Sequence, residues 1–263
     1  MKTTPIAVIQ LALEGFREVL KRVPSTIGIE TQTICNRACL YCPNSTEQRP
    51  KAVLPTETYC RVLGELAQIG FRGELQLHGW GEPLLDKRIL ELMTMARNTI
   101  PKCTIVIATN GDYLTGELMD ELEKAGCSRL LITDHSRVGM ITSRSYFRRM
   151  KIIHRSLDDL PMENVSGHVS LPIRWRRMPA CPRAARPWIT AAGDVAFCCR
   201  DYAARHGTGI NVNQADWLKR WLSWPKRLER LRAVIGPRPR QCCGCLTAVD
   251  WKNEYAEVMD ETL

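Results

Sequence analysis

The stretch from Ile34 to Asn44 holds three cysteines, Cys35, Cys39 and Cys42, in a Cys-x3-Cys-x2-Cys spacing. Thiolates are soft ligands that favour zinc or iron–sulfur sites, and three of them on one loop can converge on one centre. A structural zinc site needs four closed ligands, and no neighbouring Cys or His in the sequence supplies the fourth. Three ligands instead suit a 4Fe–4S cluster with one iron left open. The alternative is a chance group of buried free thiols.

A second group of cysteines lies near the C-terminus, where Cys181 and Cys198 are followed much later by Cys242-x2-Cys245. The segment from Trp188 to Phe197 alternates around Ala192-Gly193-Asp194, which predicts a hairpin that brings Cys181 and Cys198 together. A zinc ribbon is the structural alternative for these four residues. Two further cysteines, Cys199 and Cys243, blur the ligand assignment, whereas Cys60, Cys103 and Cys127 fit positions in the protein core.

Alternating helix and strand patterns must position these cysteines. We expect helices over Pro5–Val23, Thr56–Gly70, Lys87–Asn98 and Gly116–Ala125, and strands over Ile27–Thr33, Glu74–His78, Thr104–Ala108 and Leu130–Thr133. The period of roughly thirty residues is typical of βα units around a parallel sheet. Barrels of this type carry their sites at the carboxyl ends of the strands, and the cysteine loop follows the first strand.

The ends of the later strands are polar or glycine-rich. The second strand ends in a run, His78-Gly79-Trp80-Gly81-Glu82-Pro83, whose glycines let backbone approach a ligand and whose carboxylate can accept from an ammonium group. The third ends in Thr109-Asn110-Gly111, which is also the pattern of a simple Asn-Gly turn. His78, Asp134 and His135 are candidates for substrate contact, and a structural role is an equal alternative for each.

The cysteine loop and these strand ends resemble the radical S-adenosylmethionine (SAM) enzymes. The resemblance implies an α/β fold with a partial (β/α) barrel, a cluster on Cys35, Cys39 and Cys42, and SAM chelated by the open iron. It also implies that Tyr41 packs near the adenine and that Gly79, Trp80, Gly81, Glu82 and Pro83 form the turn that contacts the methionyl amino group. Thr109 and Asn110 match the segment that meets the ribose.

The C-terminal cysteines resemble the SPASM and shorter twitch extensions of the same family. This implies a second domain over residues 174–263, after a barrel domain over residues 1–173. There an auxiliary 4Fe–4S cluster would be ligated by Cys181, Cys198, Cys242 and Cys245. With no cysteine beyond Cys245, the chain matches the twitch type more closely than the full SPASM pattern.

The resemblance implies reductive cleavage of SAM to a 5′-deoxyadenosyl radical, which removes hydrogen from a substrate carbon. The compact twitch form favours oxidation of an alcohol in a polyhydroxylated small molecule, a sugar, aminocyclitol or nucleoside, in a biosynthetic pathway. An epimerase that uses Cys199 or Cys243 as hydrogen donor, and a peptide-modifying enzyme, remain alternatives. A metal-stabilised nucleic-acid-binding module is the alternative outside enzymology.

Composition favours a folded chain in a reducing compartment. The 263 residues are 44% hydrophobic and 25% charged, and the run from Ile6 to Leu13 is too short to cross a membrane. The twelve cysteines show metal-like spacings, which favours the cytoplasm. The net charge of +9 suits an acidic electron donor such as flavodoxin or ferredoxin, and suits nucleic acid less because no recognition module is evident. The basic runs over 148–155, 174–183 and 219–232 are expected to be solvated, and Trp217, Trp221 and Trp224 to form a helix on the small domain, interrupted at Pro225.

Overall fold

A parallel sheet forms the centre of the protein. The computed structural model describes residues 5–47, 49–135, 149–156, 165, 169, 175–177, 182–205, 207–235 and 246–248. Within these ranges the main sheet has seven strands in the order β5-β4-β3-β2-β1-β7-β8. The strands are β1 (Thr26–Ile29), β2 (Glu74–Gln76), β3 (Thr104–Thr109), β4 (Arg129–Asp134), β5 (Lys151–Ser156), β7 (Trp188–Ile189) and β8 (Val195–Ala196). Strands β1 to β5 are parallel, as is the β1–β7 pair.

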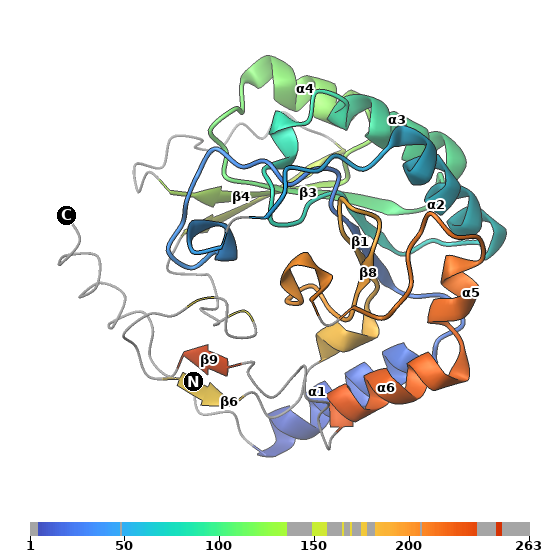
Figure 1. The fold of residues 1–263 in the computed structure, drawn as a ribbon. Coiled ribbons are helices and arrows are strands. Elements are labelled where there is room, and N and C mark those ends of the chain that lie inside the picture. The colour runs from blue at the N-terminus through green and yellow to red at the C-terminus, as the bar shows by residue number, and fades with distance from the viewer. Residues whose placement is uncertain are drawn as a thin grey trace.

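Helices connect successive strands and cover the outer face of the sheet (Figure 1). They are α2 (Thr56–Gln68), α3 (Ile89–Thr99) and α4 (Gly116–Lys124), each within two residues of the sequence prediction at either end. Their apolar stripes are buried against the strands, so that Leu63, Met93 and Leu122 share one core with Ile27 and Ile105. This burial supplies most of the stability of a βα unit, and it confirms the predicted α/β partial barrel.

The hairpin predicted around Gly193 is present and extends the main sheet. Strands β7 and β8 pair antiparallel, and Gly193 has φ of 87°, a conformation that favours glycine. Strand β7 lies against β1, where a Cβ on Gly28 would come within 2.1 Å of the Trp188 ring. Glycine at position 28 therefore permits the C-terminal segment to close on the first strand. A separate two-stranded ribbon pairs β6 (Trp175–Arg177) with β9 (Leu246–Ala248).

The tryptophan-rich segment forms two helices, α5 (Trp217–Trp221) and α6 (Trp224–Ile235), which separate just before Pro225. Trp217 and Trp221 are fully buried in the same core as Ile27 of β1. The predicted helix therefore packs on Ile189 and Val195 of the C-terminal segment, within a core that this segment shares with the barrel. The domain boundary at residue 174 stays a prediction.

Helix α1 (Pro5–Leu20) confirms the expected N-terminal helix, and it packs beside α6. Its apolar stripe is exposed, with Ile6, Ile9 and Leu13 at 49% or more. Val19, on another face, is buried with Ala185 and Val234. The apolar spacing therefore predicted the helix, but not which face of it is buried.

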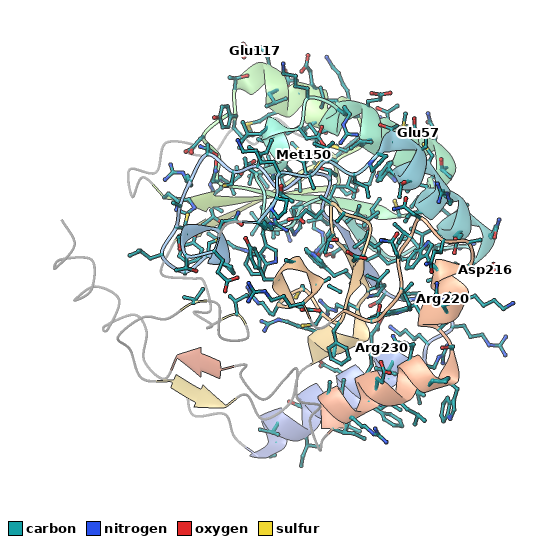
Figure 2. All side chains as sticks on the ribbon, viewed as in Figure 1. Glu57, Glu117, Met150, Asp216, Arg220 and Arg230 are labelled. Atoms are coloured by element: carbon teal, nitrogen blue, oxygen red, sulfur yellow. The ribbon has the colours of Figure 1, made fainter. Side chains whose placement is uncertain are left out.

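In the basic run over 148–155, the described side chains of Arg149, Lys151 and Arg155 are exposed, as expected, although the run enters strand β5. Two expectations about single positions are wrong. Within the run over 219–232, Arg230 is buried, and burial lowers its pKa to about 9. Its guanidinium donates to the Trp221 carbonyl oxygen at 2.7 Å and lies over the Trp221 ring. Figure 2 contrasts Arg230 with Glu57, Glu117 and Arg220 at the outer rim. Cys60 is exposed, whereas Cys103 and Cys127 are buried as expected.

In the part of the chain that the structure describes, none of the helices combines the length and the hydropathy needed to span a membrane.

Candidate active site

The cysteine loop leaves the carboxyl end of the sheet after β1, as predicted. Cys35, Cys39 and Cys42 are all half-buried. The Cys42 amide donates to the Cys39 carbonyl oxygen at 2.8 Å, and a short 3-10 helix over Pro43–Ser45 then ends the loop. Burial raises the pKa of each thiol, to about 11 for Cys42, and the neighbouring thiolates raise the pKa of Cys39 and Cys42 further. The three thiols therefore lie near enough to affect one another's pKa, in a place where a thiolate needs positive charge beside it.

This donor set fits a cluster better than a lone ion. Among the described residues, no group of three or more His, Cys, Asp or Glu is arranged to hold a single metal ion. Three thiols that repel one another as thiolates suit a larger group that carries several iron charges. One histidine far away in the sequence approaches them: His135 Nδ1 lies 3.8 Å from Cys39 Sγ, and its Nε2 lies 3.2 Å from the Tyr41 hydroxyl. The two rings stack at 6.1 Å.

Side-chain contacts fix the cysteine loop to the end of β3. Arg37 pairs with Asp112, with Nε at 2.6 Å from Oδ2, and this hydrogen bond holds the pKa of Asp112 below its usual range. The Asn36 side-chain amide donates to the same carboxylate at 2.6 Å, and the Asn110 side-chain amide donates to Asn36 Oδ1 at 2.9 Å. The predicted Thr109-Asn110-Gly111 segment thus meets the cysteine loop, and Asn110 contacts it directly.

The turn after β2 packs against the same loop through its backbone. A Cβ on Gly81 would lie 2.3 Å from the Gln32 carbonyl oxygen, so glycine is required there. The Glu82 side chain is buried, and its carboxylate accepts from Thr109 Oγ1 at 2.6 Å, from the Asn110 amide at 2.9 Å and from the Leu84 amide at 3.0 Å. Burial raises the pKa of Glu82 despite these bonds. The carboxylate thus binds strand ends of its own chain, a role that the sequence did not predict.

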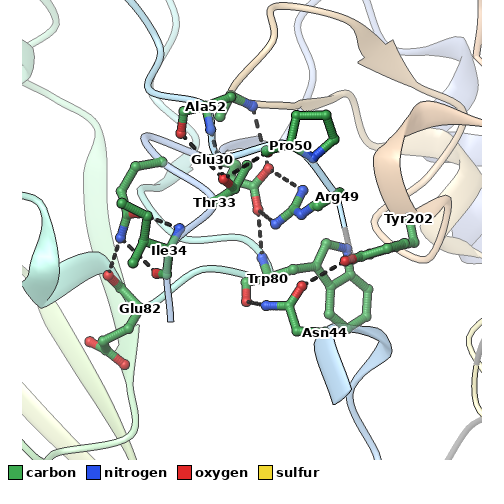
Figure 3. A network of polar contacts seen from close by, with 12 residues as sticks. Glu30, Thr33, Ile34, Asn44, Arg49, Pro50, Ala52, Trp80, Glu82 and Tyr202 are labelled. Atoms are coloured by element: carbon green, nitrogen blue, oxygen red, sulfur yellow. Dashed lines mark hydrogen bonds and ion pairs between the residues drawn. The ribbon is translucent and has the colours of Figure 1, made fainter. Parts of the chain in front are cut away.

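Sequence reasoning also missed a buried ion pair between Glu30 and Arg49 (Figure 3). Glu30 is 1% exposed at the end of β1, and Arg49 Nη1 donates to its Oε2 at 2.7 Å. The Trp80 amide donates to Glu30 Oε1 at 2.8 Å, and the Ala191 amide donates to Oε2 at 3.3 Å. One carboxylate therefore joins the segment that follows the cysteine loop, the glycine-rich turn and the β7–β8 hairpin.

Tyr202 extends this network to the C-terminal segment. Its hydroxyl donates to Asn44 Oδ1 at 2.7 Å, and the Asn44 amide donates to the Trp80 carbonyl oxygen at 2.6 Å. The Tyr202 ring packs edge-on against Trp80 at 5.8 Å, and the Arg49 guanidinium lies over it at 4.9 Å. Trp80 therefore serves as packing for Tyr202 as well as part of the predicted turn.

A cavity of about 510 Å³ opens on the inner face of the sheet. Tyr41 of the cysteine loop, His78 and Trp80 line it near the carboxyl ends of the strands, and Cys199 and Trp188 line it from the C-terminal segment. Pockets of a few hundred cubic ångströms hold ligands of the size of a sugar or a nucleotide. The cavity therefore has room for a small-molecule substrate beside the cysteine loop.

The adjacent thiols Cys198 and Cys199 have different surroundings. Cys198 is buried among Ala184, Phe197 and Ala233, and its sulfur accepts from the Arg200 amide at 3.4 Å. Cys199 faces the cavity. The other predicted ligands of the auxiliary cluster, Cys181, Cys242 and Cys245, lie outside the described residues together with Cys243, so this cluster stays a prediction.

The three predicted substrate contacts are placed differently. His78 lines the cavity, and its ring packs edge-on against Trp188 at 5.9 Å. His135 lies beside Tyr41 and Cys39 and is not part of the cavity wall. Asp134 ends β4, where its backbone pairs with Ser156 of β5.

His78 gives a pH dependence that can be measured. Burial lowers its pKa from 6.5 to about 4, with a smaller contribution from the charge of Arg155. As pH falls from 6.5 to about 4, the unfolded chain binds a proton that the folded chain does not, so stability falls across this window. We expect a loss of up to about 2 kcal/mol between pH 7.5 and pH 5. Urea unfolding at both values, compared with His78→Gln, measures it; equal losses in both proteins would assign the effect to other groups.

Comparison with known proteins identifies the class of enzyme. Residues 29–136, which hold the cysteine loop, the glycine-rich turn and the end of β3, match the Radical SAM superfamily. The chain therefore carries a radical SAM domain and is a radical SAM enzyme, whose cofactors are a 4Fe–4S cluster and SAM.

Two relatives and one solved structure show how far the similarity extends. The S-adenosyl-L-methionine-dependent 2-deoxy-scyllo-inosamine dehydrogenase of Niallia circulans is 27% identical over 186 residues, which cover 68% of this chain and 74% of the relative. The AdoMet-dependent heme synthase of Methanosarcina barkeri is 33% identical over 115 residues, and these cover only 32% of that protein. The crystal structure of BtrN in complex with AdoMet and 2-DOIA matches with a TM-score of 0.75 at 25% identity, over 84% of this chain and 92% of BtrN.

Proposed function

We propose that this enzyme oxidises an alcohol of a polyhydroxylated small molecule in a biosynthetic pathway. The observation that carries the proposal is the cavity of about 510 Å³ that reaches from Tyr41 of the cysteine loop to the inner face of the sheet. The similarity to 2-deoxy-scyllo-inosamine dehydrogenase, which extends over most of both chains, supports the same reaction type. Sugars, aminocyclitols and nucleosides are the substrate classes that fit this volume.

Cys35, Cys39 and Cys42 would hold the catalytic cluster, and that group would supply the electron for splitting SAM into methionine and a 5′-deoxyadenosyl radical. Tyr41 orients the adenine from the cysteine loop, and the turn from Gly79 to Pro83 receives the methionyl ammonium group. Since the Glu82 carboxylate already accepts three hydrogen bonds from the protein, its remaining lone pair and the backbone of the turn share this role. Thr109 and Asn110 hold the ribose side of the site.

His78 contacts the substrate hydroxyl inside the cavity. Its lowered pKa keeps the ring neutral at pH 7, so the ring can both donate and accept a hydrogen bond. Its Nδ1 has no hydrogen-bond partner among the described residues. A neutral imidazole in this place can take the hydroxyl proton as the carbon is oxidised to a carbonyl.

The second electron of an alcohol oxidation needs an acceptor. A cluster held by Cys181, Cys198, Cys242 and Cys245 has four protein ligands and no iron open to substrate, so electron transfer is the role that its chemistry allows. The first electron comes from a small acidic protein such as flavodoxin or ferredoxin, for which the net charge of +9 is complementary. Oxygen-sensitive clusters and free thiols both favour the reducing cytoplasm as the site of this reaction.

Epimerisation is the second candidate function, because the Cys199 thiol lines the cavity. An epimerase must return a hydrogen atom to the substrate carbon from the opposite face, and a thiol in the cavity wall can donate one. Cys243 was the other candidate donor, and it lies outside the described residues.

Two cysteine variants separate these functions. Anaerobically reconstituted enzyme is incubated with SAM, dithionite and polyols deuterated at each carbinol carbon, and deuterium in 5′-deoxyadenosine is measured by mass spectrometry. For an oxidation, Cys198→Ala is expected to keep SAM cleavage and lose the carbonyl product, and Cys199→Ala to keep both. If Cys199→Ala instead loses product while deuterium still reaches 5′-deoxyadenosine, the enzyme is an epimerase. Absence of 5′-deoxyadenosine from the wild type would contradict both functions.

A further inference from the structure

The cavity beside the cysteine loop is strongly basic. Five arginine side chains are part of its described lining: Arg129, Arg155, Arg183, Arg186 and Arg200. Arg155 lies near the carboxyl end of strand β5, in the wall of the sheet. Arg183, Arg186 and Arg200 come from the C-terminal segment that closes the open side of the sheet. Arginine is thus supplied from two sides of one small space. Arginines that served only as solvated surface charges would have no reason to gather around one cavity.

One acidic side chain lies among these arginines in the described lining. Glu74 is the one carboxylate among the described lining residues, and it pairs with Arg129 and accepts from the Gln76 amide. Both Glu74 and Arg129 begin their strands, so this pair lies toward the amino end of the sheet, away from the cysteine loop. His78 is held neutral, since burial and the charge of Arg155 both lower its pKa. Arg155 and Arg186, which lie away from this pair, therefore bring positive charge to the described lining.

Such a lining discriminates among the polyols that the cavity could hold. A guanidinium forms paired, charge-assisted hydrogen bonds with phosphate or carboxylate oxygens, and these are strong when water is excluded. A protonated amine in the same space meets like charge, which disfavours its binding. We propose that the substrate of this enzyme carries an anionic group, a phosphate or a carboxylate, and that Arg155 and Arg186 bind it. The inference rests on the proposed alcohol oxidation and narrows its substrate to sugar phosphates, nucleotides or sugar acids.

The proposal separates this enzyme from the dehydrogenase to which it is similar. The name of that relative, 2-deoxy-scyllo-inosamine dehydrogenase, specifies an amino-substituted ring as its substrate. At 27% identity the two chains share the radical SAM domain, but a cavity wall can change its charge without changing the fold. An amine-bearing ring is the substrate that this lining disfavours.

Calorimetric titration of the anaerobically reconstituted enzyme with SAM bound tests the proposal directly. Four ligands share a sugar ring and differ in the charged group that it carries: glucose 6-phosphate, glucuronate, glucose and glucosamine. We expect one of the two anionic ligands to bind at least roughly tenfold more tightly than glucose, and glucosamine to bind least. A preference for the phosphate or for the carboxylate then identifies the anion. If glucosamine binds as tightly as the anions, or if neither anion binds, the proposal is wrong.

Two variants show whether the anion occupies this cavity. Arg155 and Arg186 are exposed to solvent in the cavity wall, so Arg155→Gln and Arg186→Gln are expected to fold normally. Each is expected to weaken binding of the anionic ligand by roughly tenfold or more. Arg72→Gln is the matched control, because Arg72 is exposed and lies outside the cavity lining. Anion binding that survives in both cavity variants would place the site elsewhere. If the wild-type enzyme does not cleave SAM, the proposed function is wrong. The measured affinities would still show whether the cavity binds an anion.

Discussion

Replacing Cys35, Cys39 and Cys42 together by Ala is expected to abolish SAM cleavage and to remove about four of roughly eight irons per chain. The three sulfurs are the donors that the structure brings together at the carboxyl end of β1. Burial raises the pKa of Cys42 to about 11, so its thiolate is formed at neutral pH only when a metal group stabilises it. Neighbouring carbonyls and amides supply no comparable soft ligand. Iron analysis and 5′-deoxyadenosine formation with dithionite measure the two effects.

Cys60→Ala is the matched control for this experiment, because Cys60 is an exposed thiol on α2. It is expected to keep both the iron and the cleavage activity of the wild type. A triple variant that still forms 5′-deoxyadenosine would mean that other residues hold the catalytic cluster. Zinc in place of iron in the wild type would contradict the assignment of the C-terminal cysteines.

The features that the sequence predicted well are local ones. The cysteine spacing lies within one loop, the hairpin turn contains Gly193 at a positive φ, and each βα helix carries its apolar stripe in consecutive turns. Such patterns are complete within a few residues, so no knowledge of the fold is needed to read them. The two cysteines at 198 and 199 show the limit: their different surroundings depend on strand and segment packing that no spacing encodes.

The features that the sequence did not predict depend on contacts across the fold. The sequence predicts that the Glu82 carboxylate binds an ammonium group. In the structure, Thr109 and Asn110, from the next strand, already donate hydrogen bonds to this carboxylate. Arg155 is exposed, as its basic run predicts, but the run does not show that this side chain lines a cavity, which depends on β5 pairing with β4. Charge in a sequence gives no sign of where it is placed, which is why a basic cavity was found only in the structure.

The buried pair of Glu30 and Arg49 leads to the second large effect: Glu30→Ala is expected to lower the free energy of unfolding by about 3–5 kcal/mol. The side chains of Glu30 and Arg49 are 1% and 9% exposed. Removing the carboxylate leaves a buried guanidinium without its anion, and also leaves the Trp80 and Ala191 amides without their acceptor. Because a buried charge without a partner is costly, the loss exceeds that of an ordinary hydrogen bond. Urea unfolding followed by circular dichroism measures it.

A surface pair and a paired substitution show whether burial causes this loss. Glu229 pairs with Lys226 on α6, where the Glu229 side chain is 46% exposed, so Glu229→Ala is expected to cost less than about 1 kcal/mol. The double variant Glu30→Gln with Arg49→Met removes both charges and keeps an acceptor oxygen for one of the two amides, so it is expected to recover part of the stability lost in Glu30→Ala. Equal losses in Glu30→Ala and Glu229→Ala would mean that the buried pair does not form. Glu30 joins the segment after the cysteine loop, the glycine-rich turn and the hairpin. Glu30→Ala is therefore expected to weaken SAM binding under conditions where the protein remains folded. A defect confined to β1 would not have this effect.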